Sequence, residues 1–146
     1  MINLKNSYKL RKQLFTSVTS KFCEKHSGVR IGGSSDAPIE DLDPLTGMYD
    51  VIMRRNDAGD VFNRDECFTF DEAVDLYTAK SAYVDGVEKF RGSIERGFDA
   101  DLVVMATPTD DQTGIPVNLN ENAELIKSAK VRMTYVKGEL AYKASS

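Results

Sequence analysis

The chain has 146 residues, of which 41% are hydrophobic and 29% are charged, and its formal net charge is −4. These values are typical of one soluble globular domain with a buried core, and they exclude a disordered chain. No apolar run approaches the roughly 20 residues that a membrane-spanning helix needs, so we expect no membrane segment.

The N-terminus and the cysteines of the chain favour a cytoplasmic protein. The N-terminus carries lysines but no apolar signal core, so we expect no secretion signal. Cys23 and Cys67 are isolated and have no C-x-x-C spacing, so we expect them to be reduced thiols in the cytoplasm.

Residues 8–25 have the apolar periodicity of an amphipathic helix. Four apolar residues recur at every fourth position: Leu10, Leu14, Val18 and Phe22. Residues 1–30 hold seven Lys and Arg against one acidic residue, whereas the remainder holds twelve against twenty-two. A basic helix can bind nucleic acid, but no motif for that supports it here, so we expect this helix to face the acidic remainder of the chain.

Residues 29–38 combine a short apolar approach with a glycine–serine turn that contains Asp36, and Pro38 then ends any regular element. The pattern predicts a short buried strand over residues 29–33, with Asp36 at its C-terminal mouth, where α/β proteins place their chemistry. The alternative is an Asx turn, in which the Asp36 side chain binds its own backbone.

A first helix is predicted after this turn. Asp43 and Pro44 have the residue types of an N-cap and a first helical position. An apolar stripe continues to the end of this helix, which we expect over residues 44–56. Arg54 and Arg55 are expected in the last turn, where cations suit the helix dipole.

A second helix is predicted from residue 70 to about Val84. Thr69 and Glu72 have the spacing of a capping box, and Phe68 is placed to pack on Ala73 as a hydrophobic staple.

The last third of the chain is predicted to form a small sheet. Residues 102–106 are a continuous apolar run and predict a buried strand. A short helical turn is expected near residues 121–128. Apolar side chains recur at every second position in residues 131–136 and 139–142, and Lys137 and Gly138 lie between these two runs. This pattern predicts a β-hairpin. The sequence therefore predicts an α+β fold, with helices first and the sheet last.

These segments together resemble the C-terminal part of the amidohydrolase superfamily. The strings that carry the resemblance are GGSSDAP at 32–38, DP at 43–44, TFDEAVDLYT at 69–78 and GSIERGFDADLVV at 92–104. The last string fits the pattern G-S-[IL]-E-x-G-x-x-A-D-L-V-V. The branch that contains N-substituted formamide deformylases is the most similar, and the resemblance covers about residues 9–143.

The resemblance implies part of a larger fold, in which a (β/α)8 barrel joins a β-sandwich built from both chain termini. Residues 1–90 would be a partial barrel, and residues 91–146 would supply half of the composite sandwich. Within the barrel part, the implied elements are the seventh helix at 9–26, the eighth strand at 29–33, and helices at 44–56 and 70–84. The implied sandwich strands are 101–106, 131–136 and 139–142.

The resemblance also implies metal-dependent hydrolysis of C–N bonds in amides or formamides. Such enzymes use a divalent metal, usually zinc, held by a His-x-His pair and further ligands. Asp36 would be the catalytic and metal-binding carboxylate at the mouth of the eighth strand, able to accept a proton from metal-bound water.

This chain departs from the family in its ligands. Its one histidine, His26, matches no ligand position and is expected to be an ordinary residue at a helix end. A catalytic zinc needs about three protein ligands and an open water position, which Asp36 alone does not supply. We therefore expect a fragment or truncated form of such an enzyme that binds no metal and is inactive alone.

The alternative is a non-catalytic, oligomerising protein derived from the same family. Neither a single barrel strand nor half of a sandwich can bury its apolar faces unaided. We therefore expect the partner to be a second copy of the chain or the missing N-terminal barrel portion.

Overall fold

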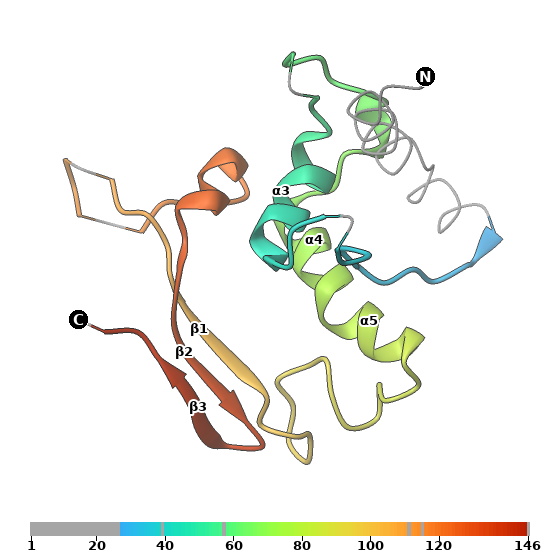
Figure 1. The fold of residues 1–146 in the computed structure, drawn as a ribbon, viewed down its shortest axis with the longest axis vertical. Coiled ribbons are helices and arrows are strands. Elements are labelled where there is room, and N and C mark those ends of the chain that lie inside the picture. Colours follow the sequence, from blue (N-terminus) through green and yellow to red (C-terminus); the bar gives the residue numbers. More distant parts are fainter. Residues whose placement is uncertain (1–26, 39, 57, 111, 115, 146) are drawn as a thin grey trace.

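The structure is a computed structural model, and it describes residues 27–145 with the exception of residues 39, 57, 111 and 115. Its elements are α3 (Pro44–Met53), η1 (Arg64–Glu66), α4 (Phe70–Tyr77), α5 (Ala79–Val84), β1 (Leu102–Ala106), η2 (Ala123–Ser128), β2 (Lys130–Val136) and β3 (Glu139–Lys143). Helices precede a small antiparallel sheet, as the α+β prediction requires (Figure 1). The predicted basic helix over residues 8–25, Cys23 and His26 lie outside the described residues. Within the described part, no helix is long and apolar enough to cross a membrane.

The start of α3 confirms the predicted cap. The Asp43 carboxylate accepts a hydrogen bond from the Leu45 amide at 3.0 Å, and Pro44 occupies the first turn. This bond satisfies one of the amides that a helix N-terminus leaves without an intrahelical partner.

The end of α3 corrects the prediction for Arg54 and Arg55, neither of which lies in the last helical turn. Arg54 is the C-cap in a left-handed conformation with φ 43°, and its side chain is only 2% exposed. The Arg54 Nε donates to the Phe62 carbonyl at 3.0 Å, and the Phe62 amide donates to the Arg54 carbonyl at 2.9 Å. The helix therefore ends early because Arg54 turns the chain back on itself.

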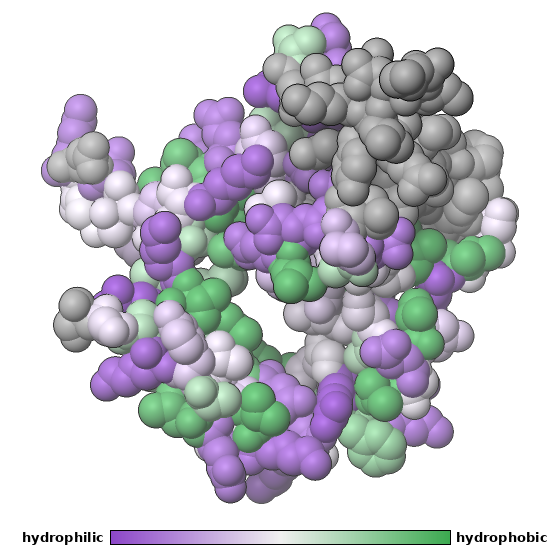
Figure 2. Space-filling view, in the orientation of Figure 1, coloured by the Kyte–Doolittle hydropathy of each residue, from purple (hydrophilic) through white to green (hydrophobic). Residues whose placement is uncertain are grey.

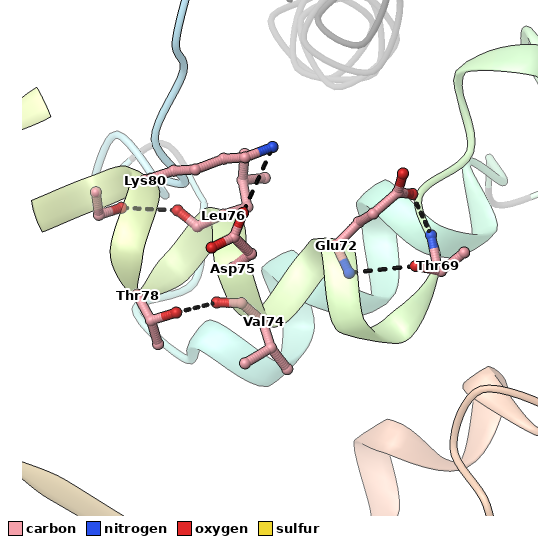
Figure 3. A network of polar contacts seen from close by, with 8 residues as sticks. Thr69, Glu72, Val74, Asp75, Leu76, Thr78 and Lys80 are labelled. Atoms are coloured by element: carbon pink, nitrogen blue, oxygen red, sulfur yellow. Dashed lines mark hydrogen bonds and ion pairs between the residues drawn. The ribbon is translucent and has the colours of Figure 1, made fainter. Parts of the chain in front are cut away.

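The start of α4 confirms the predicted capping box (Figure 3). The Glu72 amide donates to Thr69 Oγ1 at 3.2 Å, and the Thr69 amide donates to Glu72 Oε2 at 2.8 Å. Phe68 and Ala73, the predicted staple pair, are both buried.

The predicted single helix over residues 70–84 is wrong at one position. Thr78 leaves the helical region with φ −125° and ψ −95°, so α4 ends at Tyr77 and α5 begins at Ala79. The Thr78 hydroxyl donates to the Val74 carbonyl at 2.7 Å (Figure 3). The break has a physical reason, because Thr78 is β-branched and its hydroxyl competes with backbone amides for a helix carbonyl.

The core joins the two helices to a segment from the last third of the chain. The buried cluster comprises Leu45, Met48 and Ile52 of α3, Phe68, Ala73 and Leu76 in and before α4, and Ile126 and Ala129 in and after η2. The predicted helical turn is thus present as η2, a 3₁₀ helix, and it lies beside α3 (Figure 1).

The sheet has the order β1-β2-β3 with both pairs antiparallel, which confirms the predicted hairpin. Lys137 and Gly138 turn the chain with φ 51° and 83°, as the favoured two-residue hairpin turn requires. The prediction that residues 102–106 are buried is wrong, because Val103 and Val104 of β1 are 56% and 41% exposed. Met105 of β1 packs against the helical core, but most of the sheet extends away from the helices (Figure 1), and Figure 2 shows an open space between them.

The predicted strand over residues 29–33 is absent, and this segment is irregular. A strand needs a neighbouring strand for its backbone groups. Here the Gly33 amide instead donates to the Leu76 carbonyl at 2.8 Å. The segment is therefore held by a helix end rather than by a sheet.

Candidate functional site

Asp36 lies in an exposed turn after the irregular segment. Its backbone is left-handed with φ 49°, a conformation that Asp tolerates better than most residues. The Asp36 amide donates to Ser34 Oγ at 3.2 Å, so the Ser34 hydroxyl, and not the Asp36 carboxylate, closes the turn. Among the described residues the exposed Asp36 carboxylate makes no hydrogen bond, so the Asx turn that the sequence left open is not seen within this part of the chain.

Both flanks of this turn are fixed by hydrogen bonds. On the N-terminal side, Leu76 at the end of α4 accepts from the Gly33 amide and from Ser81 Oγ, both at 2.8 Å. On the C-terminal side, the Glu40 amide donates to the Ser35 carbonyl at 3.2 Å. The Asp36 turn is thus solvent-exposed but tethered on each side.

Tyr77 contacts the same segment, a role that the sequence did not reveal. A Cβ on Gly33 would lie 2.6 Å from the Tyr77 ring, and a Cβ on Gly47 would overlap the Tyr77 hydroxyl. Burial raises the pKa of Tyr77, and the nearby Asp50 carboxylate raises it further. The available signal was Gly47 within a predicted helix, where glycine costs about 1 kcal/mol relative to alanine and so requires a packing reason.

The described residues do not by themselves fit a catalytic metal ion. No group of three or more His, Cys, Asp and Glu side chains able to hold a metal ion occurs among them. A catalytic zinc takes three protein ligands beside its open position. Asp36 is thus an exposed carboxylate to which the described part of the chain brings no second and third metal ligand.

A surface cavity of about 310 Å³ lies on the hairpin, apart from the Asp36 turn. Its lining residues are Val136, Lys137, Glu139, Leu140 and Ala141. Since neither Asp36 nor its tethering residues contribute to this lining, the cavity and the candidate carboxylate belong to different regions of the molecule.

Comparison with known proteins extends this picture. A sequence model described as the amidohydrolase family matches residues 25–142. The Bacillus subtilis protein YtcJ, whose name assigns it to the amidohydrolases, is 35% identical over 121 residues. The N-substituted formamide deformylase of Arthrobacter pascens is 34% identical over 117 residues. These alignments cover 81% and 80% of this chain but 21% and 20% of the relatives, so the chain spans about a fifth of their length.

Two solved structures share the fold. An amidohydrolase from Thermotoga maritima superposes with a TM-score of 0.55 and 20% identity, covering 86% of this chain and 26% of that one. The guanine deaminase of Escherichia coli gives a TM-score of 0.62 and 21% identity, with 86% and 30% coverage. The arrangement of helices and sheet seen here therefore recurs as a part of larger proteins.

Proposed function

Because this chain belongs to the amidohydrolase family, we propose that it is one part of a metal-dependent hydrolase acting on C–N bonds. The observation that carries the proposal is the state of Asp36, a carboxylate that is exposed and tethered but has no set of companion ligands among the described residues. In this proposal residues 1–146 alone are inactive, and the remaining ligands come from sequence that corresponds to the other four-fifths of the relatives.

The proposal assigns the two regions of the chain to different parts of the complete enzyme. Residues 1–90 belong to a (β/α)8 barrel, with Asp36 at the mouth of its last strand, and residues 91–146 contribute strands to a composite β-sandwich.

Asp36 acts in this proposal as an oxygen ligand for a divalent cation such as zinc and as a proton acceptor. Its exposure lets it reach a group held by another part of the enzyme, and the fixed turn limits the entropy lost when it does so. The substrate class is an amide or N-substituted formamide, which the name of the Arthrobacter relative supports.

Coexpression with a complementing polypeptide tests this function. The Arthrobacter deformylase is produced without the segment that matches this chain, together with the full chain, and hydrolysis of an N-substituted formamide is measured. We expect activity from the pair, none from either part, and loss of about 100-fold or more with Asp36→Asn. Asp41→Asn is the matched control, because Asp41 is an exposed carboxylate nearby whose Oδ1 acceptor the Asn retains. A pair that is equally active with Asp36→Asn would contradict the proposal.

The exposed sheet favours a second candidate, a self-associating protein without catalysis. The strand registers place Leu102, Val104, Met133, Tyr135 and Leu140 on one face. Leu140 and Val104 on that face are 52% and 41% exposed, and β1 and β3 both have open edges. Sedimentation velocity at micromolar concentration should then show dimers or larger species, and a monomer throughout would contradict this candidate.

The protein is proposed to act in the cytoplasm. The sequence has two cysteines, Cys23 and Cys67, without a C-x-x-C spacing, which agrees with a reducing compartment.

A further inference from the structure

The break between α4 and α5 makes a helix carbonyl accessible to the segment that carries Asp36. In an uninterrupted helix, the Leu76 carbonyl would be occupied by the amide four residues later. With Thr78 outside the helical region, this carbonyl accepts the Gly33 amide and Ser81 Oγ, both at 2.8 Å. Figure 3 shows this carbonyl at the junction between the two helices. The break thus creates an attachment point.

The Tyr77 ring makes a second attachment beside the first. It fills the space left by the missing side chains of Gly33 and Gly47. Neither glycine has a left-handed backbone, so what the structure requires at these positions is the absence of a Cβ rather than backbone freedom. Because Gly33 is bound through its amide and packed through its Cα, its position relative to α4 is fixed in two ways.

Ser81 of α5 lies against Gly32, the residue before Gly33. A Cβ on Gly32 would lie 3.0 Å from Ser81 Oγ, and that hydroxyl also lies 3.5 Å from the Gly33 carbonyl. Asp36 is three residues further along, so its Cα lies within about 10 Å of this anchor, and the Ser34 hydroxyl bond shortens the reach. The anchor therefore limits how far the Asp36 backbone can move relative to α4.

We propose that Tyr77 and Ser81 are positioning residues, which act through Gly33 and the Leu76 carbonyl to hold Asp36 where the complete enzyme needs it. This inference rests on the proposed function for the role of Asp36. The attachment itself is a property of this chain and can be measured without any activity.

Amide hydrogen exchange on the full chain tests the attachment. Gly33→Ala brings a Cβ against the Tyr77 ring, so we expect exchange of the residue 33 amide to become about tenfold faster or more, with α3 amides unchanged as the control for folding. Adding Tyr77→Leu makes room for the Cβ and should restore protection to within about threefold. Exchange at residue 33 that is unchanged in Gly33→Ala would overturn the inference.

Kinetics of the reconstituted pair test positioning as distinct from folding. Tyr77→Ala should lower kcat about tenfold with KM nearly unchanged, because a displaced carboxylate weakens the chemical step more than substrate binding. Tyr77→Phe keeps the ring and should retain nearly full kcat. If Tyr77→Ala speeds amide exchange at residue 33 without any fall in kcat, the positioning role is overturned. Loss of activity in Asp36→Asn would still support the proposed function. If the unaltered pair has no activity, the proposed function fails, and the exchange measurement alone decides whether the attachment exists.

Discussion

The helical region and the sheet of this protein follow equally clear local rules but differ in how far they are buried. In the helical region, Ala73 of α4 and Ile126 of η2 are fully buried. In the sheet, Val103 of β1 and Leu140 and Tyr142 of β3 each remain more than half exposed. The helices pack on one another and on η2, whereas the sheet is a single layer beside an open space (Figure 2).

The difference shows that local sequence signals determine whether a helix or a strand forms, but not whether its apolar face is buried. A helix satisfies its own backbone, and two helices with one apolar stripe each can bury both stripes. A three-stranded sheet leaves two edges and needs a second layer for its apolar face. The sheet of this chain has no such layer among the described residues.

The largest expected effect is on the helical core. Ile126→Ala removes a fully buried side chain between η2 and α3, so we expect the free energy of unfolding to fall by about 2–5 kcal/mol. Leu140→Ala is the matched control in the sheet, since its side chain is half exposed, and it should cost about 0.5 kcal/mol or less. Urea unfolding of both variants measures the difference, and equal losses would contradict the contrast between the two regions.

An intermediate loss of stability is expected from a change at the start of α4. Thr69→Ala removes the hydroxyl that accepts the Glu72 amide, and should lower the free energy of unfolding by about 1 kcal/mol. Thr69→Ser keeps a hydroxyl and should recover most of this loss. If Thr69→Ala were as stable as the unaltered protein in thermal and urea unfolding, the capping box would not be a source of stability.

The smallest effect is a pH dependence in the helical region. The pKa of Tyr77 is raised in the folded state by burial and by Asp50. A raised pKa stabilises the folded state fully below the unfolded pKa, and this contribution is lost as pH rises through the folded pKa. The free energy of unfolding should therefore fall as pH rises above about 10, the ordinary tyrosine value. Tyr77→Phe should flatten this fall, and an identical slope in the variant would show that Tyr77 does not cause it.

The sequence predicted the features that short segments determine. The N-cap of Asp43, the capping box of Thr69 and the turn of Lys137 and Gly138 each depend on residues a few positions apart. Family membership could also be inferred, because the strings at 32–38 and 92–104 retain their order and spacing.

The sequence did not predict features that depend on distant contacts. The early end of α3 follows from the pairing of Arg54 with Phe62. The irregular backbone at 29–33 follows from the Gly33 amide, which binds the Leu76 carbonyl and has no neighbouring strand among the described residues. The role of Tyr77 depends on Gly33 and Gly47, which are far from it in sequence. Asp36 was identified from its turn, but the bond between its amide and the Ser34 hydroxyl could not be predicted from residue types alone.

Metal content measured by elemental mass spectrometry is the most direct test of the central claim, that Asp36 completes a site whose other ligands belong to the part of the enzyme that corresponds to the other four-fifths of its relatives. The chain alone, the pair with the complementing deformylase polypeptide, and the pair with Asp36→Asn are each dialysed against trace zinc. We predict no stoichiometric zinc in the chain alone, about one zinc per pair, and a marked loss with Asp36→Asn. Stoichiometric zinc in the chain alone, or an unchanged zinc content in the Asp36→Asn pair, would contradict the claim.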